Sequence, residues 1–115
     1  MSLKNAAIGE KKEKLGGSGL GTAHKFACEI PDMDGAFTMA ARLELEPGAS
    51  IGYHKHADNE EVYVIISGEG IYCEENREEP AAAGDVFLCR RGNSHSLKNT
   101  GAGKLIIGAA IAKRG

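Results

Sequence analysis

The chain has 115 residues, of which 42% are hydrophobic, and its formal net charge at pH 7 is −2. This length suits one domain with one core, and the charge argues against nucleic-acid binding, which is typical of strongly basic surfaces. The apolar runs are far shorter than the roughly 20 residues that span a membrane, and no apolar segment follows the first lysine, so we expect neither a membrane helix nor a signal peptide. The three cysteines, Cys28, Cys73 and Cys89, are odd in number and far apart, which favours a reduced, cytoplasmic protein.

The beginning of the chain differs in composition from the rest. Residues 1–21 are polar and then rich in glycine, which predicts a flexible N-terminal arm. Such an arm could also pair with a partner subunit. In residues 22–115 we expect a single β-barrel domain.

Strand patterns follow one another from Thr22 onward, and no stretch shows a convincing helical period. In residues 37–45 (F-T-M-A-A-R-L-E-L) apolar side chains recur at every second position, which is typical of a half-buried strand. Further short strands are predicted at residues 61–67, 71–74, 86–89, 94–98 and 104–112, with a polar turn at 76–80. The spacing of these strands, together with the 16 glycines of the chain, predicts an all-β sandwich or closed barrel.

The strand predicted at residues 61–67 (E-V-Y-V-I-I-S) is apolar on both faces. Tyr63 and Ile65 face one way, and the side chains on the other face are Val62, Val64 and Ile66. Since the outer face of a barrel wall is normally wet, a second apolar face needs a cover. A second copy of the chain is the expected cover, which predicts a homodimer. The alternative is that the two packed sheets cover each other.

Three of the four histidines accompany these strands, together with one glutamate. His54 and His56 are two residues apart at the expected start of a strand, so both imidazoles point to the same face. Glu61 follows after a short polar turn and returns beside this pair if the turn reverses the chain. His95 lies at the head of a later strand. Three imidazoles and one carboxylate that meet at one point would form a divalent-metal site, whereas each residue alone is as well explained as a surface side chain.

These residues fall into a longer pattern. Gly48 is followed after five residues by the pair His54 and His56, after four more by Glu61 and after six more by Gly68. This stretch resembles the first motif of the cupin superfamily, in which glycine, H-x-H, glutamate and glycine occur at these spacings.

A second stretch resembles the second cupin motif. Five residues separate Gly84 from Arg90, and one residue separates Arg90 from Gly92. Two residues then precede His95, and three more precede Asn99. The family has proline where this chain has Arg90, which is the one departure from the pattern. Together the two motifs cover nearly half of the chain.

The resemblance to cupins implies an all-β jelly-roll barrel, also called a double-stranded β-helix, with a metal ion in its mouth. It assigns the ligand role to His54, His56, Glu61 and His95, with one divalent ion per chain. Because these ligands are nitrogen and oxygen atoms without a thiolate, we expect Mn or Fe(II) first, and Ni or Zn next. Four protein ligands leave one or two positions of a five- or six-coordinate ion open for a small-molecule ligand.

Two side chains are candidates for contact with that small molecule. Tyr63 lies two residues after Glu61 and is expected to point into the same cavity. Arg90 could lie at the cavity rim and pair with a carboxylate or phosphate, although a solvated arginine at a strand end is the simpler explanation. Tyr53 should point away from the cavity, and we interpret His24, which is outside both motifs, as a surface or strand histidine.

The first functional hypothesis is a metal-dependent enzyme that acts on a small organic molecule, as a dioxygenase, decarboxylase or isomerase, with the ion as Lewis acid or O2 carrier. The alternative is a non-catalytic small-molecule-binding or sensor module. This alternative stays open because few candidate bases, beyond Tyr63, accompany the ligands. The sequence identifies no catalytic residue, and a fold by itself does not select a substrate.

Overall fold

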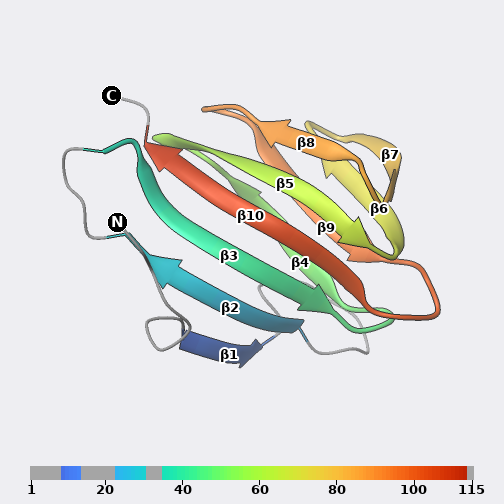
Figure 1. Ribbon diagram of the computed structural model, residues 1–115. Coiled ribbons are helices and arrows are strands. Elements are labelled where there is room, and N and C mark those ends of the chain that lie inside the picture. Colours follow the sequence, from blue (N-terminus) through green and yellow to red (C-terminus); the bar gives the residue numbers. More distant parts are fainter. Residues whose placement is uncertain (1–8, 14–22, 31–34, 114–115) are drawn as a thin grey trace.

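The structure is a computed structural model of the chain, and it describes residues 9–13, 23–30 and 35–113 (Figure 1). Within these residues the chain folds into ten β-strands. They are β1 (Gly9–Glu13), β2 (Ala23–Glu29), β3 (Phe37–Leu45), β4 (Ser50–Lys55), β5 (Asn59–Ser67), β6 (Glu69–Glu74), β7 (Arg77–Ala82), β8 (Val86–Cys89), β9 (Ser94–Asn99) and β10 (Leu105–Lys113). In this part of the chain no helix has the length and apolar character needed to cross a membrane.

The strands form two antiparallel sheets. The first sheet has the order β1-β2-β3-β10-β5-β8 and the second has the order β4-β9-β6-β7. The chain passes repeatedly from one sheet to the other, since β4 lies in the second sheet while β3 and β5 lie in the first (Figure 1). This winding of antiparallel strands is that of a jelly roll. The predicted all-β, double-stranded β-helix fold is therefore confirmed.

The core lies between the two sheets. Met39, Leu43 and Leu45 of β3 are buried, as the alternation of the sequence predicts, because successive side chains of a strand point to opposite faces. Strands of both sheets supply the remaining large core residues, which are Ile51, Tyr63, Ile65, Tyr72, Phe87, Leu97, Leu105 and Ile107. The barrel is thus a packed interior in which polar side chains need partners.

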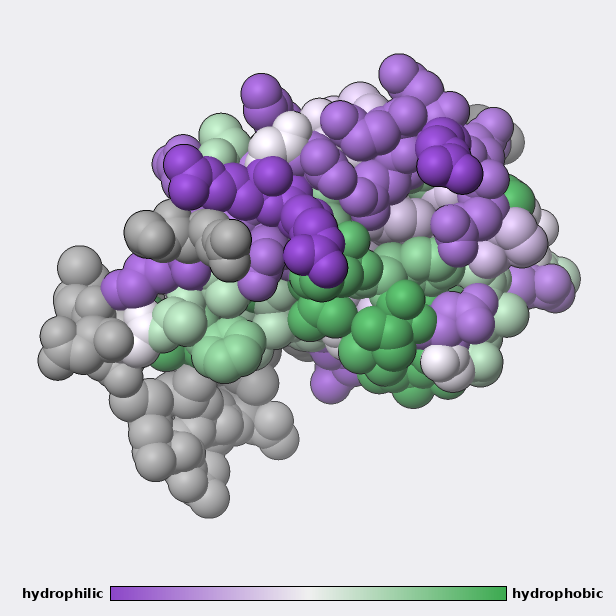
Figure 2. Space-filling view, turned by 90° about the horizontal axis from the view of Figure 1, so that it is seen from above, coloured by the Kyte–Doolittle hydropathy of each residue, from purple (hydrophilic) through white to green (hydrophobic). Residues whose placement is uncertain are grey.

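The outer face of β5 and β8 is apolar as well. Val64 and Ile66 of β5 are 40% and 54% exposed, and Val86 and Leu88 of β8 are 60% and 42% exposed. Val64 is directly opposite Val86 in the ladder, so these four side chains form one surface, which we call the apolar patch. Figure 2 shows hydrophobic residues gathered in one area beside a polar surface. The packing of the two sheets covers only the inner face of these strands. Within the described residues, the alternative that the two sheets cover both apolar faces of residues 61–67 is therefore wrong.

The second sheet differs from the sequence prediction at β7. The sequence predicts a polar turn at residues 76–80, but the strand Arg77–Ala82 lies there and pairs with β6. The chain reverses at Glu75 and Asn76, which have positive φ values of 50° and 64°. Because β7 is an edge strand on which nearly every side chain is exposed, it lacks the alternating apolar pattern that identifies a strand.

The predicted N-terminal arm also contains a strand. Of residues 1–21 the structure describes Gly9–Glu13, which form β1 and pair with β2 at the edge of the first sheet. The sequence GEKKE has no apolar alternation that could have predicted this strand, and the flexibility of the arm stays a prediction. The rest of the predicted arm lies outside the described residues, and the domain boundary at residue 22 stays a prediction.

Candidate metal centre

Both sheets contribute to the cluster of predicted ligands. His54 lies near the end of β4 and His56 follows that strand, so the H-x-H pair does not begin a strand as the sequence predicts. His95 of β9 is opposite His54 in the antiparallel ladder. A short turn then reverses the chain, and β5 brings Glu61 back to the pair. The expected reversal before Glu61 is therefore confirmed.

The four side chains converge on one point. The three Nε2 atoms of His54, His56 and His95 are 3.0 to 3.2 Å apart. Oε1 of Glu61 lies 3.1 Å from Nε2 of both His56 and His95 and 3.9 Å from Nε2 of His54. Three of these residues are buried, whereas the side chain of His54 is 40% exposed. The cluster is therefore most accessible on the side of His54.

The other ring nitrogens face oxygen atoms. Nδ1 of His54 lies 2.6 Å from the carbonyl oxygen of Gly52, and Nδ1 of His56 lies 2.6 Å from Oδ1 of Asn59. These oxygens accept hydrogen bonds, so each Nδ1 carries the proton and each Nε2 presents a lone pair to the cluster. Two imidazole lone pairs and one carboxylate oxygen thus face the same small space, an arrangement that favours a cation there.

The protonation states also suit metal ligands. Burial by itself raises the pKa of Glu61, but the adjacent imidazoles of His54 and His95, whose protonated forms the carboxylate would stabilise, outweigh it and lower the pKa to about 2. Glu61 accepts a hydrogen bond from the protonated form of His54 and so raises the pKa of His54, whereas burial lowers the pKa of His95. At neutral pH Glu61 is therefore ionised and His95 is neutral, as metal binding requires.

The separations of the donor atoms indicate which kind of ion would fit. Two nitrogens that are each about 2.1 Å from one ion are about 3.0 Å apart at a right angle and about 3.4 Å apart at a tetrahedral angle. The observed Nε2 separations of 3.0 to 3.2 Å are nearer to the right-angle value. Three imidazoles and one carboxylate could therefore hold a divalent ion that prefers octahedral coordination, for which four protein ligands are an incomplete set.

Tyr63 points into the barrel, as the sequence predicts. Its ring stacks on that of His95 with a centroid distance of 4.8 Å and an interplanar angle of 15°. Burial, and then the Glu61 carboxylate, raise the pKa of its hydroxyl, so Tyr63 keeps its proton at neutral pH. Tyr53 is 49% exposed and points outward, also as predicted. Contact of Tyr63 with a small molecule stays a prediction.

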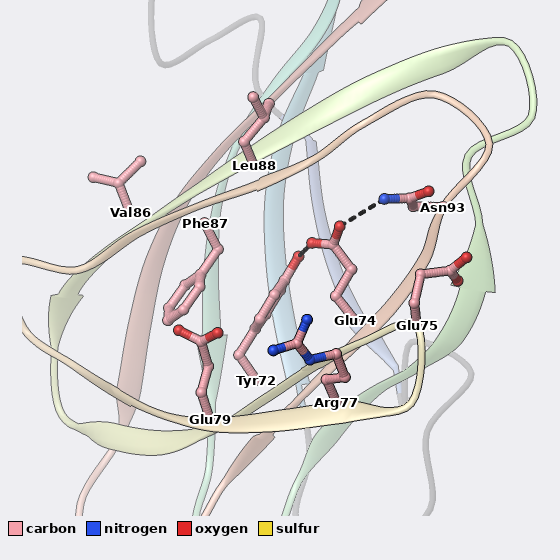
Figure 3. A pocket seen from close by; sticks show the side chains of 9 residues that line it. All are labelled: Tyr72, Glu74, Glu75, Arg77, Glu79, Val86, Phe87, Leu88 and Asn93. Atoms are coloured by element: carbon pink, nitrogen blue, oxygen red, sulfur yellow. Dashed lines mark hydrogen bonds between the residues drawn. The ribbon is translucent and has the colours of Figure 1, made fainter.

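A pocket of about 520 Å³ opens between β8 and the β6–β7 hairpin (Figure 3). The four cluster residues do not line this pocket, but Tyr72 does. The hydroxyl oxygen of Tyr72 lies 3.1 Å from Nδ1 of His95. Its charged lining residues are Glu74, Glu75, Arg77 and Glu79. Arg90 is exposed and does not line this pocket, so its predicted position at a cavity rim stays a prediction.

Sequence reasoning missed the outer partners of the histidines, which are Asn59, Tyr72 and Glu74. Tyr72 and Glu74 occupy alternate positions of β6, and this period of two could have placed them on one face of the strand. Nothing in the sequence links them to His95, because that contact forms across the pairing of β6 with β9.

Comparison with known proteins assigns the family. Residues 41–108, more than half of the chain, match the family model described as the cupin domain. The chain belongs to the cupin family. A solved structure described as a predicted oxalate decarboxylase from Thermotoga maritima is 32% identical, with a TM-score of 0.85, over 98% of this cupin and 99% of that chain.

Two further relatives match smaller parts. An oxalate-binding protein from Thermotoga maritima is 46% identical over 61 residues, which are 53% of this cupin and 50% of that protein, so the alignment spans half the length of this curated relative. The cupin domain of Schizosaccharomyces pombe Cnp3 is 20% identical, with a TM-score of 0.72, over 79% of this cupin and 64% of that chain. The latter similarity concerns the fold alone.

The cupin-motif residues outside the cluster shape the turns of the barrel. Gly68 has a φ of +93°, and a Cβ atom there would lie 2.5 Å from the carbonyl oxygen of Lys104. The side chain of Asn99 is buried and donates hydrogen bonds of 2.8 Å to the carbonyl oxygens of Leu45 and Gly103. These two motif positions therefore have structural roles.

Proposed function

We propose that this cupin binds one divalent metal ion through His54, His56, Glu61 and His95, and that the ion binds a small organic acid. The observation that supports this proposal most strongly is that one ligand atom from each of these residues lies within 4.8 Å of the others. The similarity to an oxalate-binding protein, and to a structure described as a predicted oxalate decarboxylase, supports an acid of the oxalate class.

The charge of the cluster suits an anionic ligand. The pKa of Glu61 is about 2, so this residue supplies one negative charge at neutral pH. Because imidazoles bind as neutral ligands, a divalent ion in this set keeps a net positive charge that attracts a carboxylate. The bound ion would supply Lewis-acid chemistry or carry O2.

Tyr63 and Arg90 are the side chains that we assign to the acid. Tyr63 keeps its proton, which forms a hydrogen bond with Glu61, and its ring stacks on His95, so its role would be to transfer this hydrogen bond from Glu61 to an oxygen atom of the acid. Arg90 is exposed and would contribute through long-range attraction of the anion, or by pairing with it at the entrance.

Mn and Fe(II) are the ions that we propose first, and Ni and Zn follow. The Nε2 separations near the right-angle value favour ions with octahedral preference over a tetrahedral zinc. The absence of thiolate from the ligand cluster also argues against a structural zinc, which is typically bound by cysteines.

Turnover of the acid is the first candidate function, by a decarboxylase, dioxygenase or isomerase reaction. Non-catalytic binding is the second, and one observation favours it. Decarboxylation and isomerisation need a group that moves a proton, but the two hydroxyls beside the cluster, those of Tyr63 and Tyr72, have raised pKa values because they are buried. Both hydroxyls therefore stay protonated at neutral pH and are not available to accept a proton from the acid.

Calorimetric titration of the manganese-loaded protein with oxalate tests the proposal. We expect binding that is lost in the metal-free protein, that is weaker in His54→Ala, and that weakens from oxalate to longer dicarboxylates. Incubation with oxalate under air and under nitrogen, with analysis of carbon dioxide and formate, then separates turnover from binding alone. Equal oxalate binding with and without metal would contradict the proposal.

A second copy of the chain is the proposed cover of the apolar patch. The patch is formed by Val64, Ile66, Val86 and Leu88, and a two-fold symmetric contact would bury the same apolar surface on both subunits. Free thiols at Cys73 and Cys89 support the further proposal of a reducing, cytoplasmic location.

A further inference from the structure

The hydroxyl of Tyr72 lies between two partners. It is 3.1 Å from Nδ1 of His95 and 2.7 Å from Oε1 of Glu74. The second carboxylate oxygen of Glu74 accepts a hydrogen bond of 2.8 Å from Nδ2 of Asn93, and Figure 3 shows both contacts of this carboxylate. The ring of Tyr72 is 3% exposed and stacks on Phe87 at 4.2 Å. The hydroxyl is therefore held in place by packing on one side and by a carboxylate on the other.

The chemistry of these groups determines the direction of the hydrogen bonds. A carboxylate group can only accept, so the single proton of the Tyr72 hydroxyl is donated to Glu74. The oxygen of Tyr72 is then left to accept from His95, which places the ring proton of His95 on Nδ1. The lone pair of His95 consequently lies on Nε2, the atom that faces Glu61 and the other two histidines.

We propose that Glu74, acting through Tyr72, is a positioning residue that fixes the tautomer of His95 in which Nε2 is free to bind the metal. The proposal rests on the proposed function, because it concerns the fourth ligand of the same site. Beyond the proposed function, it states that Glu74, which lines the pocket between β6, β7 and β8, controls how well His95 binds the metal. His54 and His56 have other acceptors at Nδ1, Gly52 and Asn59, so the effect of Glu74 is specific to His95.

The loss of a negative charge near the cluster would also weaken the binding of a cation, so the variants must separate charge from hydrogen bonding. Glu74→Gln and Glu74→Leu remove the same charge, but only glutamine keeps an oxygen that accepts from Tyr72. Glu79 lines the same pocket, and its backbone pairs with Tyr72 across the β6–β7 ladder. Glu79→Leu is therefore a matched control for the loss of charge and of polar surface.

The first readout is the affinity of the full-length protein for Mn(II). Groups that orient a ligating histidine typically change metal affinity 10- to 100-fold. We expect Glu74→Leu to weaken Mn(II) binding at least tenfold, whereas Glu74→Gln and Glu79→Leu should stay within about threefold of the wild type. Tyr72→Phe, which removes the acceptor itself and is nearly isosteric, should weaken binding as Glu74→Leu does.

The second readout is the imidazole nitrogen NMR spectrum of the metal-free protein, which reports the tautomer without any metal. We expect His95 to carry its proton on Nδ1 in the wild type and in Glu74→Gln, and the Nε2-protonated form to become populated in Glu74→Leu. An unchanged tautomer in Glu74→Leu would overturn the proposal, and so would equal weakening by glutamine and leucine. If the wild type bound no metal the proposed function would fail, but the spectrum would still decide whether Glu74 fixes the tautomer.

Discussion

Removal of single histidines provides a quantitative test of the metal centre. Metal that binds only the folded state at a thousandfold excess over its Kd stabilises the protein by about 4 kcal/mol. For a domain of this length 1 kcal/mol corresponds to roughly 4 °C, so saturating metal should raise the Tm at pH 7.5 by roughly 16 °C. If His54→Ala weakens the affinity about a hundredfold, a tenfold excess remains and the gain falls to about 1.4 kcal/mol, or roughly 6 °C.

Substitution of the half-exposed His54 and of the buried His95 should affect the stability of the metal-free protein differently. His54 is 40% exposed at its side chain, so His54→Ala should leave the Tm of the metal-free protein nearly unchanged. His95 is 1% exposed and stacks on Tyr63, so His95→Ala should also create a cavity and cost about 2 to 4 kcal/mol without metal, while the protein still folds. The backbone of His24 in β2 lies opposite that of Glu44 in β3. His24→Ala serves as the control, because His24 is not one of the four proposed ligands.

Differential scanning fluorimetry with and without each metal gives both the Tm of the metal-free protein and the rise in Tm on metal binding. We expect a large metal-induced shift in the wild type and in His24→Ala, and a much smaller shift in His54→Ala and His95→Ala. Equal shifts in all four proteins would refute the assignment of the ligands.

Metal affinity should fall as pH drops from about 7 to 5, because a protonated imidazole cannot bind the metal. Glu61 raises the pKa of His54, so His54 should be protonated first. Competition titrations that gave the same Kd at both pH values would contradict this. Gly68→Ala should lower the free energy of unfolding in urea more than Gly84→Ala, since both residues have positive φ but only Gly68 is crowded by backbone atoms; equal losses would show that the crowding is unimportant. Light scattering should give a dimer for the wild type and for Lys98→Glu but a monomer for Val64→Glu, and a monomeric wild type at micromolar concentration would exclude the proposed contact.

The sequence predicts the fold and the composition of the cluster well because both depend on local patterns. Alternation in residues 37–45 identifies β3, and the turn before Glu61 returns that residue to the H-x-H pair. The cupin-like spacing then adds His95, which meets His54 only through the pairing of β4 with β9. Spacing along the chain was therefore sufficient to predict which four residues form the cluster, whereas their role as metal ligands stays a proposal.

The parts that the sequence could not predict depend on contacts without a local pattern. The edge strands β1 and β7 are mostly polar, so neither shows the alternation that identifies a half-buried strand. The hydrogen bonds of Tyr72 to Glu74 and to His95 join residues whose relation is set by sheet pairing and by the packing of Tyr72 on Phe87. Their existence could be established only from the folded structure.

Metal content per chain shows whether His54, His56, Glu61 and His95 bind one divalent ion. Protein purified without chelator, loaded separately with Mn(II), Fe(II), Ni(II) or Zn(II) and then desalted, can be analysed by inductively coupled plasma mass spectrometry beside the Glu61→Ala/His95→Ala double variant. We expect close to one equivalent per chain for at least one of these ions and a value near zero for the double variant. A value near zero for every ion in the wild type, or an equal content in both proteins, would contradict it.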